Sequence, residues 1–123
     1  MKGMRLFTGM LTLMGAGIAA LVVAGCHTES PATPLSQLNP QQMHGHQVFQ
    51  AQCALCHLDR EKGSTTGPSL LGVYRKPSLP SGAAATDERV EATITHGRNM
   101  MPAMGGQLDE GDLNDLIAYL HTL

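Results

Sequence analysis

The sequence predicts an all-α domain in which three helices are joined by long loops. Three segments each carry a helix start signal ahead of apolar residues at helical spacing. No stretch alternates polar and apolar residues with a period of two over the length of a strand. No internal repeat is visible, and a chain of 123 residues is expected to form one small domain.

The first 25 residues are predicted to be a secretory signal. Lys2 and Arg5 precede an uncharged, apolar run from Leu6 to Ala24, the pattern of a positive n-region and an apolar h-region. The ending Ala-Gly-Cys resembles the bacterial lipobox, which implies that residues 1–25 are removed and that Cys26 is lipidated. An uncleaved transmembrane anchor, which a run of this length can just form, and an ordinary cleaved signal remain open. We expect an exported lipoprotein, anchored on the periplasmic or extracytoplasmic face of a membrane.

A polar, proline-containing segment, residues 26–39, follows and is predicted to be a lipidated N-terminus and flexible tether. The folded domain is expected over residues 40–123. Its first helix has a strong start signal, because Asn39 can be the N-cap, Pro40 suits the first helical position and Gln42 completes a capping box. We predict a helix from Pro40 towards Gln52.

Loops and short turns fill the centre of the chain. Residues 58–67 are polar and are predicted to be a loop, residues 68–75 could hold one or two helical turns, and residues 77–86 are a loop again. Loops of this length inside a compact domain usually serve a site.

Two further helices are predicted. Thr86 or Asp87 caps the second, which carries Val90 and Ile94 on one face and stops at Gly97. The last helix starts near Asp109 with an acidic first turn. Its apolar stripe consists of Leu113, Leu116, Ile117, Leu120 and Leu123.

Composition limits the possible functions. Of the 8 Lys and Arg residues two leave with the signal, whereas all 10 Asp and Glu residues stay, so the net charge falls from −2 to −4. Such an acidic domain will not bind nucleic acid nonspecifically. After Cys26 the aromatic residues are Phe49, Tyr74 and Tyr119. A small domain with so few aromatic side chains needs another stabilising group.

That group is indicated by residues 53–57, which read CALCH, the C-x-x-C-H signature of covalent haem attachment. Positions three apart lie on one face of a helix, so Cys53 and Cys56 can each add to one vinyl group of a haem. His57 is then held beneath the iron. A zinc site would need more soft ligands at paired spacing, and a thioredoxin-like dithiol would need a βαβ setting. We predict one covalent haem c and no free thiol.

The order of motifs resembles the monohaem class I cytochromes c over about residues 45–123. The matching residues are Gly45 and Phe49, CALCH, Gly67-Pro68, Met101-Pro102, and Leu116 and Tyr119. The resemblance implies a small cytochrome c fold wrapped around the haem, in which the first and last helices cross. It also implies that the carbonyl of Pro68 accepts the second N–H of His57, a bond that fixes the tautomer of the ligand.

The second axial ligand of the iron has four candidates: Met100, Met101, Met104 and His96. Pro102 disfavours the α conformation for the residue before it, so Met101 sits on an extended, stiff piece of loop. In the family that this chain resembles, the same Met-Pro pair carries the ligand. We predict Met101, with Met100 as the main rival.

Protein ligands on both faces of the iron leave no position for a substrate, which favours a one-electron carrier over an enzyme. Its partners would be redox proteins, and complementary charge favours partners with a basic docking patch. Three alternatives stay open. One is a haem subunit of a larger oxidoreductase complex. Another is a gas-binding haem sensor or enzyme with a labile methionine ligand. The third is a copper-handling lipoprotein that uses the same soft ligands.

Overall fold

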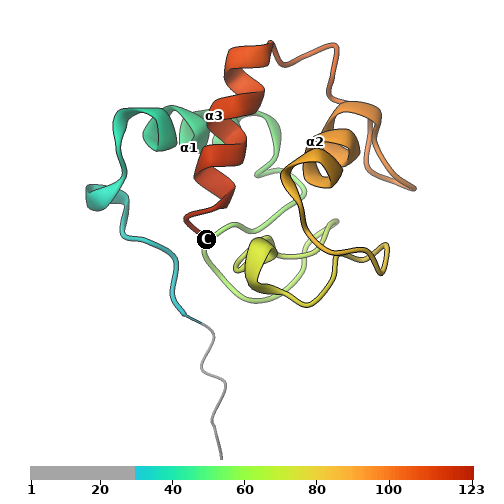
Figure 1. The fold of residues 1–123 in the computed structure, drawn as a ribbon, viewed down its shortest axis with the longest axis horizontal. Helices are drawn as coiled ribbons and strands as arrows, with labels where there is room; N and C mark the ends of the chain where they lie inside the picture. The colour runs from blue at the N-terminus through green and yellow to red at the C-terminus, as the bar shows by residue number, and fades with distance from the viewer. Residues whose placement is uncertain (1–29) are drawn as a thin grey trace, which may run out of the picture.

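The computed structural model describes residues 30–123, and this part of the chain is all-α (Figure 1). Its helices are α1 (Pro40–Gln52), α2 (Asp87–His96) and α3 (Glu110–Leu120), with short 3-10 turns η1 (Leu35–Gln37) and η2 (Val73–Arg75). The described chain has isolated bridges but no strand. The predicted signal and Cys26 lie outside the described residues. Within residues 30–123, no helix has the length and apolar character needed to cross a membrane.

The start of α1 is the predicted capping box. The backbone N–H of Gln42 donates to Oδ1 of Asn39 at 2.8 Å, and the backbone N–H of Asn39 donates to Oε1 of Gln42 at 3.0 Å. Two backbone donors that the helix itself cannot satisfy are therefore paired. Pro40 occupies the first helical position, where its missing N–H costs nothing.

The ends of α2 and α3 also follow the predicted signals. Gly97 ends α2 with a φ of 73°, in the left-handed region that glycine adopts freely. Asp109 caps α3 by accepting the backbone N–H of Asp112 at 2.8 Å. The predicted stripe of α3 extends past the helix, which ends at Leu120. Leu123 is nevertheless 1% exposed, because the chain turns back after α3.

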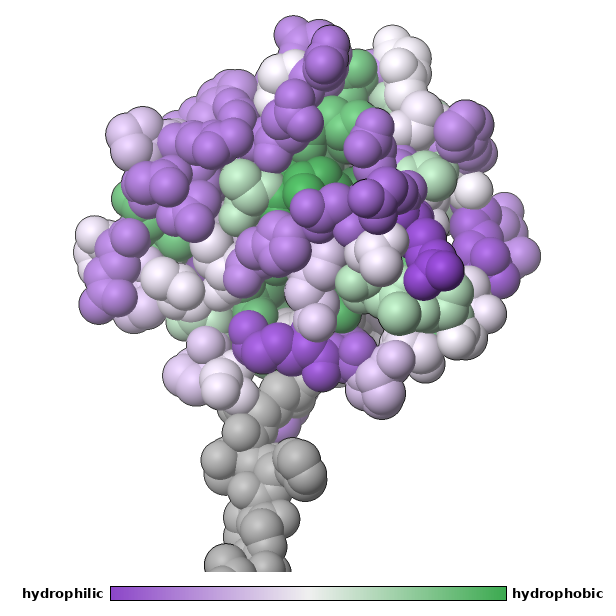
Figure 2. Space-filling model, in the orientation of Figure 1, coloured by the Kyte–Doolittle hydropathy of each residue, from purple (hydrophilic) through white to green (hydrophobic). Residues whose placement is uncertain are grey.

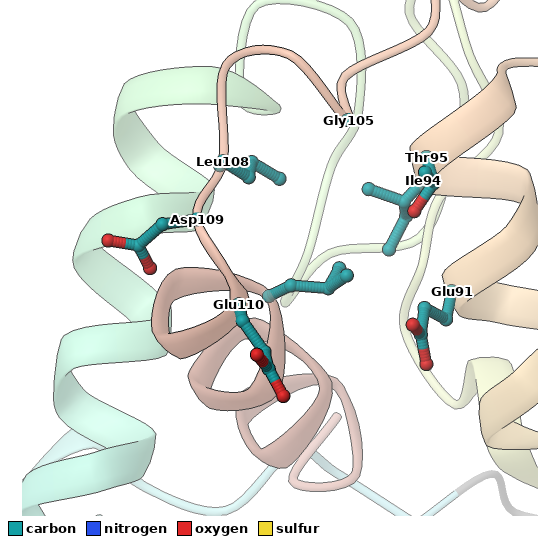
Figure 3. Close-up of a pocket in the computed structure, with 8 residues that line it drawn as sticks. Glu91, Ile94, Thr95, Gly105, Leu108, Asp109 and Glu110 are labelled. Carbon is teal, nitrogen blue, oxygen red and sulfur yellow. The ribbon is translucent and has the colours of Figure 1, made fainter.

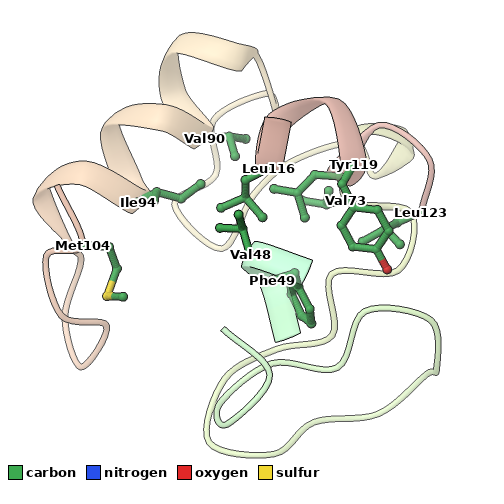
Figure 4. Packing of buried hydrophobic residues seen from close by; sticks show 10 residues of the cluster. Val48, Phe49, Val73, Val90, Ile94, Met104, Leu116, Tyr119 and Leu123 are labelled. Atoms are coloured by element: carbon green, nitrogen blue, oxygen red, sulfur yellow. The ribbon is translucent and has the colours of Figure 1, made fainter. Parts of the chain in front are cut away.

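Helices α1 and α3 cross in close contact, as the resemblance implied. A Cβ atom at Gly45 would lie 1.9 Å from the carbonyl oxygen of Asp115, so only glycine allows this approach. One turn further along α1, the rings of Phe49 and Tyr119 pack with their centroids 6.0 Å apart. Figure 4 shows the surrounding buried cluster: Val48, Phe49, Val73, Val90, Ile94, Met104, Leu116, Tyr119, Leu120 and Leu123.

The segment before α1 is docked on the domain over its described part. We call Ser30–Leu38 the N-terminal strap. The backbone N–H of Thr33 donates to the carbonyl of Thr122 at 2.7 Å. The guanidinium groups of Arg75 and Arg60 donate to the carbonyls of Ser30 and Thr33. Because these bonds and apolar contacts hold it, the strap differs from the free linker that its polar composition predicts.

Candidate functional site

The CALCH segment directly continues α1. Cys53 is the C-cap of α1, and its carbonyl accepts the backbone N–H groups of Cys56 and His57 at 3.0 and 2.9 Å. Both cysteines are half-buried, form no disulfide and are separated by about one turn. Burial and, to a smaller extent, the neighbouring Cys56 raise the pKa of the Cys53 thiol to about 11. Before haem attachment this thiol is therefore neutral at ordinary pH.

The imidazole of His57 is oriented by the chain that follows. Its Nδ1 lies 2.8 Å from the carbonyl oxygen of Pro68. A carbonyl oxygen can only accept, so Nδ1 must carry the proton. In a neutral imidazole the other nitrogen, Nε2, then has a free lone pair and can bind a metal.

The loop that carries Pro68 is fitted closely to the CALCH segment. A Cβ atom at Gly67 would lie 2.4 Å from Cε1 of His57, so a side chain there would displace the ring. The carbonyl of Cys56 accepts two hydrogen bonds, from the backbone N–H of Gly67 at 2.7 Å and from Oγ1 of Thr65 at 2.5 Å. This role of Thr65 is not predictable from the sequence, because nothing in the pattern of a polar loop singles it out.

The methionine segment forms a tight turn. Arg98 and Met101 exchange backbone hydrogen bonds of 3.0 and 2.9 Å, and Asn99 adopts a φ of 52° inside the turn. Met100 therefore lies at the tip, where its side chain is 86% exposed. Met101 is half-buried and packs against the core.

The same segment is fixed to the end of α2. The backbone N–H of Met104 donates to the carbonyl of Ile94 at 2.9 Å, and Gly105 donates to Thr95 at 3.2 Å. Met104 itself is 8% exposed and belongs to the core cluster. His96 is exposed, and its Nδ1 lies 3.0 Å from the carbonyl of Ala92 in its own helix. The four candidate ligands thus have four different environments.

A surface hollow lies between α2 and α3 (Figure 3). Its lining residues are Glu91, Ile94, Thr95, Gly105, Leu108, Asp109, Glu110 and Leu113. None of the predicted haem-binding residues contributes to it, so this hollow is separate from the chemistry above. The described residues also contain no cluster of three or more His, Cys, Asp or Glu side chains suited to a metal ion.

Three histidines make contacts that the sequence did not predict. Nδ1 of His44 lies 2.8 Å from Oδ2 of Asp115, which adds a polar link between α1 and α3. His46 packs edge-on against the ring of Tyr119. His121 stacks on Tyr74 at 3.7 Å between centroids, and its Nε2 lies 2.7 Å from Oδ1 of Asp87. Pairs this distant in the chain leave no local signal.

Comparison with known proteins identifies the family. A family model described as cytochrome c oxidase, cbb3-type, subunit III matches residues 40–120. The chain belongs to the monohaem class I cytochromes c. Cytochrome c6 of Picosynechococcus sp. is 33% identical over 79 residues, which cover 62% of this chain and 68% of the relative. A cytochrome c6-like protein of Nostoc sp. is 31% identical, with 63% and 67% covered. The crystal structure of cytochrome c6 from the diatom Phaeodactylum tricornutum is 27% identical, with a TM-score of 0.49 and 64% and 88% covered.

As a class I cytochrome c, this chain carries covalently bound haem c and is a small electron carrier. Its own residues fit that group. Cys53 and Cys56 present two thiols one turn apart, and His57 presents a free Nε2 beside them. Met101 carries a thioether sulfur on a loop whose two ends are fixed by backbone hydrogen bonds. Thioether and imidazole are ligands that haem iron accepts.

Proposed function

We propose that His57 and Met101 are the axial ligands of the haem iron in a membrane-tethered one-electron carrier. The contrast between two neighbouring methionines carries the proposal. Met101 is half-buried, and backbone bonds to Arg98 hold it in place. Met100 projects from the turn with 86% of its side chain exposed. A ligand must be held against the haem, and of the two only Met101 has that support.

The remaining haem contacts follow from the CALCH geometry. Cys53 and Cys56 would form the two thioether bonds to the haem vinyl groups. Pro68 would act on the iron through His57, because its carbonyl keeps the proton on Nδ1 and turns Nε2 towards the metal. Bound in this way, the haem supplies a reversible one-electron couple, and ligation by histidine and methionine raises its potential.

A carrier needs an accessible route for the electron and a surface for brief docking. Leu55 lies between the two cysteines and is 90% exposed, and Met100 beside the proposed methionine ligand is almost as exposed. One of these exposed apolar side chains belongs to the CALCH segment and the other to the methionine segment. Small interfaces suit redox partners that must dissociate after each transfer.

The membrane attachment would come from Cys26. The charged n-region, the apolar run and the small residues before Cys26 support an exported lipoprotein. Two or more acyl chains hold a protein stably at a bilayer, whereas one gives only reversible binding. The redox partners would therefore act in the same extracytoplasmic compartment.

The ligand assignment is tested by matched substitutions in the matured holoprotein. Met101→Ala should abolish the absorption band that arises from sulfur bound to ferric iron, and the reduced protein should then bind carbon monoxide. Met100→Ala, one residue away on the exposed tip, should leave the band and the reduction potential unchanged. Loss of the band in Met100→Ala alone would overturn the assignment. Carbon monoxide binding by the unsubstituted protein would favour a gas sensor or haem enzyme instead.

A second candidate is a haem subunit of a larger oxidoreductase complex. The description of the matching family model, which names a subunit of an oxidase, favours it. Mild solubilisation of the native membrane, followed by a measurement of particle size, distinguishes a free carrier from a subunit of a complex. A free carrier should migrate at its own size, whereas a dedicated subunit should remain with its complex.

A further inference from the structure

The N-terminal strap leaves only residues 26–29 between the proposed lipid and the folded domain. Ser30 is already held, since its carbonyl accepts a hydrogen bond of 2.7 Å from Arg75. Thr33 is bonded on both sides, by its N–H to Thr122 and by its carbonyl to Arg60. Ala32 packs against the core cluster. The anchored unit therefore begins at Ser30, well before α1.

The length of chain outside the folded unit limits how far the domain can move from its anchor. Fully extended, residues 26–29 reach at most about 14 Å. A free tether over residues 26–39 would reach about 50 Å. Docking of the strap thus removes most of the reach that the sequence alone would allow.

Helix α3 gives the direction of the domain relative to this anchor point. The strap is bonded to Thr122, just past the C-terminal end of α3. Because α3 has 11 residues, its acidic N-terminal end lies about 16 Å further along the helix axis. Figure 1 shows the described chain beginning in the lower half of the view, on the side of η2, with the start of α3 at the top.

Charge is mixed at the anchored end and acidic at the far end, since Asp87 and Glu88 lie beside Tyr74 of η2. Arg75 is the last residue of η2 and holds the strap, and Lys76 and Lys62 line a shallow hollow that includes Ser69. At the far end, Asp109 and Glu110 lie at the start of α3. Polar side chains dominate the face in Figure 2, and apolar ones come to the surface mainly between α3 and α2. Anionic headgroups repel the acidic start of α3 more strongly than the mixed end that carries Arg75, Lys76 and Lys62.

We propose that the face formed by the strap, η2 and Lys62 rests on the anionic phospholipid headgroups of the membrane. The acidic start of α3 points away from the bilayer. This proposal rests on the lipidation of Cys26. The short connection and the repulsion of the acidic far end hold the domain in one orientation, so its redox partners must present their centres close to the same membrane surface.

The test measures the orientation of the lipidated holoprotein in vesicles of phosphatidylcholine and phosphatidylglycerol. With all three native cysteines modified, an introduced cysteine is the single free thiol and takes a spin label. The labelled positions are Ser78→Cys, exposed just past Lys76, and Glu110→Cys, exposed at the start of α3. The haem is kept reduced, and the bilayer contains nickel-chelating lipids, whose paramagnetic nickel increases the relaxation rate of nearby spin labels. The relaxation rate of the label should rise strongly at position 78 and stay close to its vesicle-free value at position 110.

Two variants distinguish the effect of the docked strap from the effect of the lipid anchor. Thr33→Pro combined with Arg75→Gln removes two bonds of the strap and should make the two labels respond alike, whereas Ser36→Ala on the exposed η1 should not. Equal relaxation at both labels in the lipidated, unsubstituted protein would overturn the orientation and leave the carrier function standing. Mass spectrometry that finds no lipid on Cys26 would overturn the anchor and this proposal together.

Discussion

The hydroxyl of Tyr119 donates a hydrogen bond of 2.5 Å to Oδ2 of Asp59. Tyr119 is fully buried on α3, and Asp59 lies two residues after His57. The same carboxylate oxygen accepts a longer bond of 3.4 Å from Gln50 on α1. One side chain thus ties both crossing helices to the segment that carries the proposed histidine ligand.

Replacing Tyr119 by Phe should lower the free energy of unfolding by about 1–3 kcal/mol, because the half-buried carboxylate of Asp59 loses its shortest hydrogen bond while the ring still packs. Urea denaturation of the holoprotein, followed by far-ultraviolet circular dichroism, measures the change. The same substitution in an Asp59→Asn background completes a double-mutant cycle. A coupling energy near zero would mean that the hydrogen bond contributes nothing to stability.

Alkaline pH should destabilise the protein through its buried phenols. Burial raises the pKa of Tyr119, and the hydrogen bond to Asp59 raises it further. Burial and Asp87 raise the pKa of Tyr74 in the same way. A raised pKa in the folded state leaves stability intact below the ordinary phenol pKa of about 10 and reduces it as the pH rises beyond that value. The free energy of unfolding should fall above about pH 10.

Removing one phenol should weaken this alkaline dependence, and removing both should weaken it most. Tyr119→Phe, Tyr74→Phe and the double variant provide the series, with the free energy of unfolding measured at several pH values. An alkaline slope that is identical in all four proteins would assign the effect to other groups.

At acid pH the relevant contact is the one between Asp87 and His121. The hydrogen bond from His121 lowers the pKa of Asp87. A lowered pKa in the folded state gives stability above the pKa of the unfolded carboxyl, and this stability is lost as the pH falls through the folded value. Both side chains are exposed, so Asp87→Asn should cost at most about 1 kcal/mol at neutral pH.

Unfolding titrations of Asp87→Asn and the unsubstituted protein should converge once the pH falls below the pKa of Asp87 in the folded protein, where the carboxyl is protonated in both states. His121→Gln should reproduce the neutral-pH loss. A difference that persists unchanged into acid would show that packing, and not charge, is responsible.

The close approach of α1 and α3 should make Gly45→Ala strongly destabilising. The new methyl group would overlap the backbone of Asp115, which cannot move without separating the helices. Overpacking of this kind costs about 1–3 kcal/mol or more. Gly106 is the matched control, because a Cβ atom there meets nothing within 4 Å. Thermal unfolding of the two alanine variants should therefore differ clearly, and similar melting temperatures would contradict the close contact.

The sequence by itself determined the helices and the chemistry. Asn39 with Gln42, Gly97 and Asp109 are local signals, since each acts on backbone groups within a few residues, and all three mark the helix ends that the structure has. The CALCH segment is equally local, because two thiols and an imidazole within five positions are sufficient to predict a haem.

Only the tertiary structure decided which distant groups meet. The contacts of Tyr119 with Asp59 and of His121 with Asp87, and the docking of the strap on Thr122, join residues that no local pattern relates. The strap shows the reason most clearly. Its polar composition predicts a free linker, but its backbone groups find partners on surfaces that exist only after α1, η2 and α3 have packed together.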